Sequence, residues 1–282
     1  MSPGLVTLVL VAALLHASWN AVAKSGGSAI YSIAAFRLVA AAGSLCVVWW
    51  VDLPSPAAWP YIIASMVIHN LYYFTLGQAY KTGDLSLVYP LFRGLAPIMV
   101  AAGAAWFAGE YLSPRALMGV GLISAGLMAL ALFGGHRIRA SLPALGWGLL
   151  TSMFIAAYTV LDGMGVRVVE NSLSYILWLF VFEALPIGAW LVITQRQRWF
   201  TWLGQNPAQV LGGGLASSAA YGLVIYAMSI GAMALVSSLR ETSVIFAALI
   251  GTLLLKEPFG RQRIIAACLV AVGVIVIRYQ AY

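Results

Sequence analysis

Ten apolar segments, each about 20 residues long, follow one another along this chain with only short polar breaks between them. A helix of that length crosses the roughly 30 Å hydrocarbon core of a bilayer. Proline and glycine turns such as Ser113-Pro114 and Asn206-Pro207 separate the segments. We expect spans at about residues 4–23, 30–50, 59–80, 87–108, 114–134, 143–165, 173–194, 207–230, 235–255 and 261–278. The connecting loops are too short for a soluble domain, so consecutive helices are predicted to be antiparallel neighbours.

The composition indicates that this chain folds within a lipid bilayer. Of 282 residues, 62% are apolar and 8% are charged, whereas about 25% of a soluble domain is charged. The net charge of +7 comes from scattered basic residues, without the basic runs and interleaved aromatics typical of nucleic-acid binding. We therefore expect an all-α integral membrane protein with no nucleic-acid partner. The chain becomes apolar at Leu5 without a basic leader, which predicts a retained first span and not a cleaved signal peptide.

The second half of the chain repeats a pattern of the first half. Each copy has an arginine, a glutamate 17 residues later and a glycine 16 residues after that: Arg93, Glu110 and Gly126, then Arg240, Glu257 and Gly273. A repeat at a fixed offset indicates duplication, so the ten spans divide into two five-helix repeats, residues 1–138 and 139–282. Because five is odd, the second repeat enters the membrane from the opposite side. Inverted repeats are typical of transporters that alternate between two conformations around a central site.

Polar side chains inside the spans indicate where a substrate binds, because such groups are costly in lipid and usually face the bundle interior. Aromatic rings would stack on an apolar or cationic side chain, an arginine would pair with a carboxylate, and the histidines and asparagines would supply hydrogen bonds. Each residue has an alternative role in packing or interhelical bonding. The candidate substrate-binding residues are His16, Trp19, Asn20, His69, Asn70, Tyr73, Tyr89, Arg93, Tyr158, Glu183, Tyr221, Ser237 and Arg240.

Several charged residues have two interpretations. Glu183, near the middle of the seventh span, is either a proton-coupling site or half of a buried pair. Arg240 and Glu241 either line the site or pair with partners near a helix end. Arg37 lies about one turn inside the second span and is expected to snorkel to the membrane surface. Glu110 lies at the exit of a span and is expected to be helix-end or gate structure.

The two repeats differ in their proline content. Pro90 and Pro97 lie in the fourth span and predict a break or kink near Arg93. The ninth span has no matching proline and carries Ser237 and Ser238 in that region. The repeats therefore share a frame but differ in pocket chemistry, as an asymmetric substrate requires.

Enzyme motifs are absent from the sequence. It contains no HExxH, GxSxG or paired-aspartate metal motif. Cys46 and Cys268 have no metal-ligand spacing, and the histidines stand in separate segments. We therefore expect no enzyme activity, no cofactor and no structural metal.

The arrangement of ten spans in two five-helix repeats resembles that of the EamA-type transporters of the drug/metabolite transporter superfamily. The matching features are Arg37 early in the second span, the Gly109-Glu110 exit from the fourth span and Lys256-Glu257 in the second copy. The resemblance covers essentially the whole chain. It implies a ten-helix bundle around a central cavity and a multi-pass protein of a bacterial inner (plasma) membrane. It also implies export or exchange of small metabolites, among which amino acids are the commonest in bacterial members.

We therefore expect a secondary transporter that exports small metabolites, above all aromatic or large neutral amino acids, by alternating access. Its partners are the small-molecule substrate and the lipid bilayer, and a monomer is compatible with the sequence. The alternatives are an organic-cation exporter that uses Glu183, a phosphorylated or nucleotide-sugar carrier, and a structural or lipid-flipping role. The distribution of basic residues favours external termini, whereas the resemblance implies cytoplasmic ones.

Overall fold

The computed structural model describes residues 1–25, 27–82, 85–132, 142–255 and 261–279, and these residues form helices but no strand. The predicted all-α class is therefore confirmed for the described residues. The helices follow the predicted apolar segments closely: α1 Pro3–Ser25, α2 Ala29–Val47, α3 Trp59–Thr82, α4 Leu85–Ala108, α5 Pro114–Leu132, α6 Leu142–Gly165, α7 Ser172–Gln205, α8 Pro207–Ile230, α9 Met233–Arg240, α10 Ser243–Leu255 and α11 Arg261–Arg278. Short 3₁₀ turns occur at Val48–Trp50, Pro56–Ala58 and Val166–Val168.

Six of the described helices are long and apolar enough to cross a membrane: α1, α2, α4, α6, α7 and α8. Two further helices, α5 and α11, contain shorter apolar stretches at Pro114–Leu130 and Ile264–Arg278. Length and composition thus agree with a multi-pass membrane protein.

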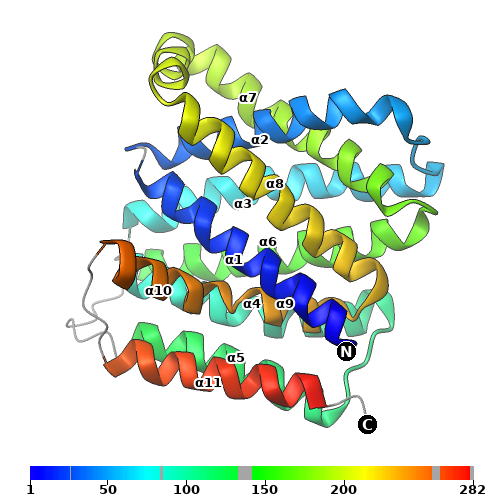
Figure 1. Ribbon diagram of the computed structural model, residues 1–282, viewed down its shortest axis with the longest axis vertical. Coiled ribbons are helices and arrows are strands. Elements are labelled where there is room, and N and C mark those ends of the chain that lie inside the picture. The colour runs from blue at the N-terminus through cyan, green and yellow to red at the C-terminus, as the bar shows by residue number, and fades with distance from the viewer. Residues whose placement is uncertain (26, 83–84, 133–141, 256–260, 280–282) are drawn as a thin grey trace.

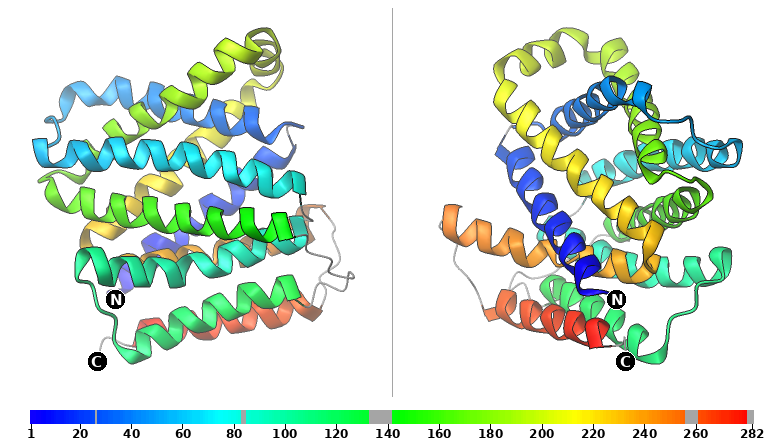
Figure 2. Two further views of the ribbon diagram at one scale, coloured as in Figure 1. Left: turned by 180° about the vertical axis from the view of Figure 1, so that it is seen from behind. Right: turned by 45° about the vertical axis from the view of Figure 1, so that its right-hand side comes forward.

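Helices from the two halves of the chain pack against each other throughout the bundle. The pairs are α1 with α8, α2 with α7, α3 with α6 and α5 with α11. Figure 1 shows α5 and α11 as a pair at one edge, with α1 and α8 running obliquely across the near face. Seen from behind, α3, α6 and α4 lie side by side (Figure 2). The start of α1 and the end of α11 lie at the same end of the bundle.

Local sequence signals explain where several helices begin and end. The Asn171 side chain accepts a hydrogen bond from the Leu173 amide at 3.0 Å and caps α7. Proline is the first residue of α5 and α8, a position where its missing N–H costs nothing. After α4, Gly109 has φ of 64°, and the Glu110 amide bonds the Ala104 carbonyl at 3.0 Å. This left-handed glycine closes the helix and turns the chain toward α5.

The helix break lies in the ninth predicted span and not in the fourth. α4 runs as one helix through Pro90 and Pro97, so of the predicted break or kink the break is wrong. The ninth span divides between α9 and α10 at Glu241 and Thr242. There the Glu241 and Thr242 amides bond carbonyls only three residues back, and the Thr242 hydroxyl bonds the Leu239 carbonyl at 2.7 Å. Hydroxyl groups that compete for backbone carbonyls can interrupt a helix without proline.

α7 extends beyond its predicted end near residue 194. The helix reaches Gln205, but the backbone at Gln195 is non-helical, with φ of −139° and ψ of 25°. The predicted end of the apolar segment therefore coincides with a kink.

The close packing of α5 against α11 depends on glycine. A Cβ atom added at Gly273 would lie 2.8 Å from the Gly119 carbonyl oxygen, a backbone atom that cannot move aside alone. We expect Gly273→Ala to lower the thermal unfolding temperature of the detergent-purified protein, with a cost of about 1–3 kcal/mol. Gly121→Ala is the matched control, because a Cβ there meets nothing within 4 Å. Equal unfolding temperatures for the two variants would contradict this close helix contact.

Candidate functional site

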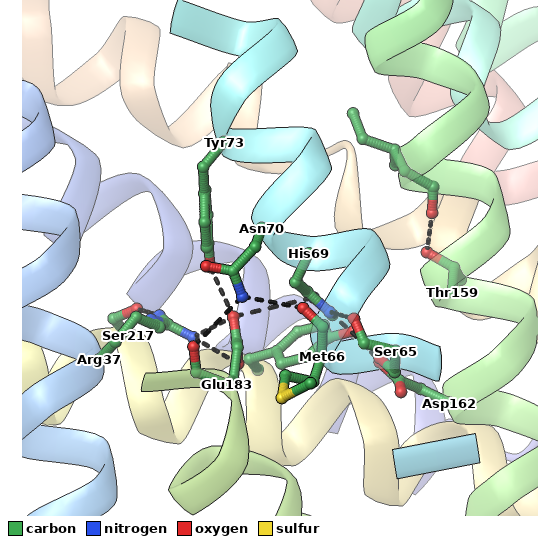
Figure 3. Close-up of polar contacts among 12 residues, drawn as sticks. Arg37, Ser65, Met66, His69, Asn70, Tyr73, Thr159, Asp162, Glu183 and Ser217 are labelled. Atoms are coloured by element: carbon green, nitrogen blue, oxygen red, sulfur yellow. Dashed lines mark hydrogen bonds and ion pairs between the residues drawn. The ribbon is translucent and has the colours of Figure 1, made fainter. Parts of the chain in front are cut away.

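One polar cluster is centred on Glu183 of α7, whose side chain is completely buried. Arg37 of α2 places Nη1 3.3 Å from Glu183 Oε2 and 3.4 Å from Oε1. Tyr73 of α3 donates a hydrogen bond to Oε1, and Ser217 of α8 accepts one from Arg37 Nη2. Figure 3 shows Glu183 between Arg37 and His69. The expectation that Arg37 snorkels is wrong, because only 7% of this residue is exposed and its guanidinium is paired inside the bundle.

His69 connects Glu183 to a second buried carboxylate. His69 Nε2 lies 4.0 Å from Glu183 Oε1, and Nδ1 lies 3.0 Å from the Ser65 carbonyl and 3.1 Å from the Ser65 hydroxyl. The Ser65 hydroxyl also bonds Asp162 of α6. Asp162 accepts two further hydrogen bonds, from Tyr175 at 3.0 Å and from Tyr221. We call Arg37, Glu183, His69 and Asp162 the acid cluster.

A second polar cluster is centred on Glu241, at the break between α9 and α10. Arg93 Nε from α4 lies 2.8 Å from Glu241 Oε2, and Arg240 Nη2 lies 3.6 Å from Oε1. Arg93 Nη2 lies 3.4 Å from His16 Nε2 of α1. The two arginines and the glutamate are all buried. We call Arg93, Arg240, Glu241 and His16 the arginine cluster.

Arg240 retains hydrogen-bonding capacity that the described residues do not fill. Its Nε and Nη2 atoms are buried without a hydrogen-bond acceptor in that part of the chain, and so is the hydroxyl of Ser237, three residues earlier in α9. A buried donor without an acceptor costs about 1–3 kcal/mol, and more when the group is charged. Such atoms in a folded protein require an explanation, and an anionic ligand would satisfy them.

The two clusters differ in their balance of acidic and basic groups among the described side chains. In the arginine cluster, two guanidinium groups share one carboxylate, which leaves one positive charge. In the acid cluster, two carboxyl groups share one guanidinium, which leaves one negative charge when both carboxyl groups are ionised and His69 is neutral. Buried charge is costly without a partner. Each cluster therefore favours a ligand group of the opposite sign.

Two tyrosines lie between the clusters. The Tyr158 ring stacks on His69 with centroids 3.9 Å apart and planes inclined by 23°. Tyr221 meets the same histidine edge-on at 5.4 Å and lies 6.0 Å from Tyr158. Tyr158 is also close enough to the arginine cluster to interact electrostatically with its charges. The tyrosines form an aromatic wall that both clusters adjoin.

The other predicted residues have more local roles. Trp19 packs edge-on against the His16 ring with centroids 5.0 Å apart. The Asn20 side chain donates to the His16 carbonyl at 2.7 Å within α1. Asn70 donates to the Met66 carbonyl at 2.8 Å and also to the Glu183 carbonyl at 3.5 Å. Tyr89 belongs to α4, but its side chain is outside the described residues.

Three charged residues of the clusters are missing from the candidate set: Arg37, Asp162 and Glu241. All three lie in helices or at a helix break within apolar sequence. A charge inside a span is by itself a sign of function, so this signal alone would place them among the candidates. The same signal does not show which residues pair, because Glu183 and Arg93 come from segments far from Arg37 and Glu241 in the sequence.

Glu110 lies apart from both clusters, at the helix ends. Its Oε2 atom is 3.0 Å from Arg167 Nη2. Arg167 also donates to the carbonyls of Met228 at 2.9 Å and Gly231 at 2.7 Å. This ion pair ties the exit of α4 to the ends of α6 and α8, in agreement with a helix-end role. Its counterpart Glu257 is outside the described residues.

Comparison with known proteins finds a family resemblance in the second half of the chain and a similar fold over the whole chain. A protein of known crystal structure aligns with 100% of this chain and 98% of its own, with a TM-score of 0.79 and 17% identity, a likeness that shows the fold alone. No curated protein matches this chain. Residues 142–279 match the EamA-like transporter family. The predicted resemblance to the EamA-type transporters of the drug/metabolite transporter superfamily is therefore confirmed by the family match over residues 142–279, in the second half of the chain.

Proposed function

We propose that this protein is a secondary transporter that exports zwitterionic metabolites, above all aromatic or large neutral amino acids, across the inner membrane of a bacterium. The observation that carries the proposal is the pair of buried clusters, one with two guanidinium groups around a single carboxyl group and the other with two carboxyl groups and a single guanidinium. An amino acid has a carboxylate and an ammonium group, so it supplies one group of each sign for the two clusters. The EamA-like family consists of transporters, which supports carriage over catalysis.

The substrate carboxylate would bind the arginine cluster. Within the described part of the chain, Arg240 has buried donors without acceptors, and Arg93 approaches the same carboxylate, Glu241, from another helix. Guanidinium groups form strong, directional hydrogen bonds with carboxylates. Glu241 thus holds the place of a substrate carboxylate and would release the arginines when the substrate binds. The Ser237 hydroxyl, which has no hydrogen-bond partner among the described residues and lies three residues before Arg240 in α9, offers a further donor.

The rest of the substrate would lie along the aromatic wall. Its ammonium group would face the acid cluster, where Glu183 and Asp162 leave one negative charge. Its side chain would pack against Tyr158 and Tyr221, whose rings favour stacked or edge-on contact with another aromatic ring. This arrangement favours aromatic and large neutral amino acids over small polar ones.

The helix contacts support an inverted repeat of residues 1–138 and 139–282, with ten spans and alternating access. If the repeats are equivalent, α1 corresponds to α6 and α3 corresponds to α8. The contact of α3 with α6 then has the contact of α8 with α1 as its counterpart, and both are present. The contact of α4 with α6 likewise becomes that of α9 and α10 with α1, and both are again present. The α2–α7 and α5–α11 contacts map onto themselves. Such a two-fold frame gives two related conformations, each open to one side.

Counterflow in proteoliposomes tests the proposal. Purified protein is reconstituted, the vesicles are loaded with one unlabelled compound, and uptake of its labelled form is followed for amino acids, organic cations and sugar phosphates. We expect saturable exchange of phenylalanine, tryptophan or leucine and none in protein-free vesicles. Exchange of organic cations alone would favour the drug-exporter alternative, in which the acid cluster holds the cation. Exchange of sugar phosphates alone would favour the phosphorylated-sugar alternative.

A further inference from the structure

Substrate binding does not by itself explain the position of His69. Its Nδ1 atom lies 3.0 Å from the Ser65 carbonyl, which can only accept a hydrogen bond. Nδ1 therefore carries the hydrogen in the neutral ring, and Nε2 presents a bare lone pair. That lone pair lies on the side of Glu183 Oε1, 4.0 Å away, so two acceptors oppose each other with no proton between them. One added proton would turn this opposition into an ion pair.

We propose that His69 and Glu183 share an exchangeable proton, and that the carrier exchanges one proton for one substrate molecule. This inference rests on the proposed function. When Glu183 and Asp162 are both ionised and His69 is neutral, the described side chains of the acid cluster have one negative charge in excess of the Arg37 guanidinium. A proton on His69 neutralises that charge, and so does the ammonium group of a bound substrate. Both together would leave a surplus positive charge, so each disfavours the binding of the other, and this coupling is reciprocal.

The proton balance of the cycle follows from this competition. When the substrate leaves toward one side, His69 Nε2 takes one proton from the water on that side. After the protein changes conformation, a substrate molecule binding from the other side displaces this proton into the water there. One proton and one substrate molecule therefore cross in opposite directions in each cycle.

The second carboxylate extends the proton site. The Ser65 hydroxyl lies 3.1 Å from His69 Nδ1 and bonds Asp162, so Glu183, His69, Ser65 and Asp162 form one connected row. Figure 3 shows the row running from Arg37 to Asp162. The groups that face His69 and Glu183 come from each surrounding helix: Arg37 from α2, Tyr73 from α3, Asp162 and Tyr158 from α6, Tyr175 from α7, Tyr221 from α8, and the arginine cluster beyond Tyr158.

Histidine NMR tests the proton site without any transport assay. The chain has three histidines, so ¹⁵N-histidine labelling gives few ring signals, and His69→Gln assigns one of them. In substrate-free protein we expect His69 to change from the Nδ1–H tautomer to imidazolium as the pH falls. Adding phenylalanine at a fixed pH should return it to the neutral form. A His69 ring that stays in one protonation state under all these conditions would overturn the inference.

An imposed pH gradient tests the coupling. With the membrane potential clamped, a gradient of one pH unit supports up to about tenfold accumulation of labelled phenylalanine for each proton exchanged. His69→Gln should lower the steady-state ratio to about one, a value that does not depend on the transport rate. Glu170→Gln is the control, because Glu170 is exposed between α6 and α7 and should keep the wild-type ratio.

The outcomes separate this inference from the proposed function. If the wild type shows phenylalanine counterflow but its accumulation ratio stays at one, proton exchange is wrong and the carrier proposal stands. If no compound on the panel exchanges, the proposed function fails. In that case the histidine titration by NMR still tests whether His69 binds an exchangeable proton, independently of transport.

Discussion

Replacing either Arg93 or Arg240 with glutamine is expected to abolish exchange of phenylalanine while the protein remains folded. Each change removes the surplus positive charge of the arginine cluster, because the remaining arginine then pairs with Glu241 alone. A substrate carboxylate would lose its counter-charge. Truncating one partner of a buried charge pair costs about 2–5 kcal/mol, which corresponds to a roughly 30-fold or greater loss of affinity.

Arg198→Gln is the matched control for this pair of variants. Arg198 is exposed in the last part of α7, beyond the kink at Gln195, so its loss should leave counterflow unchanged. Size-exclusion profiles and thermal unfolding report whether each variant is folded. Normal exchange by folded Arg93→Gln and Arg240→Gln proteins would remove the arginine cluster from the substrate site.

Glu183→Leu is expected to destabilise the protein by about 3–5 kcal/mol, because it leaves Arg37 charged and buried without its partner. The effect should appear as a lower unfolding temperature of the detergent-purified protein. The double variant Arg37→Met with Glu183→Leu should recover most of the loss, since apolar side chains of similar volume often replace a buried ion pair at little cost.

The two variants together separate stability from function. Both the single and the double variant remove the Glu183 carboxylate. Neither should therefore accumulate phenylalanine under a pH gradient, even where the double variant is stable. An unfolding temperature of Glu183→Leu equal to the wild type, or a double variant as unstable as the single one, would contradict the buried pair.

The helices were predictable because each depends on its own stretch of sequence. Apolar length, the prolines at the start of α5 and α8, and Gly109 at the end of α4 mark their limits directly. The break between α9 and α10 was not predictable from its own stretch of sequence. It depends on hydroxyl groups that compete for backbone carbonyls and on the Glu241 carboxylate, which pairs with Arg93 of another helix. A proline in α4 gives a strong local signal, yet that helix continues through it.

The sequence points to several members of the two clusters but not to their pairing. Polar and charged side chains are energetically costly inside a membrane, and this cost singles out His69, Glu183, Arg93 and Arg240 one by one. It gives no sign that Arg37 meets Glu183, because 146 residues separate them along the chain. The opposite charges of the two clusters emerge only when these long-range partners are known.

Exchange of phenylalanine compared with its two singly charged analogues tests the central claim most directly. Phenethylamine keeps the ammonium group and the ring but lacks the carboxylate, and hydrocinnamate keeps the carboxylate and the ring but lacks the ammonium group. We expect phenylalanine to compete for its own counterflow, and both analogues to compete at least about tenfold more weakly, a difference of roughly 1.4 kcal/mol or more. If either analogue competes as well as phenylalanine, the substrate contacts only one of the clusters, and zwitterion recognition by two oppositely charged clusters is wrong.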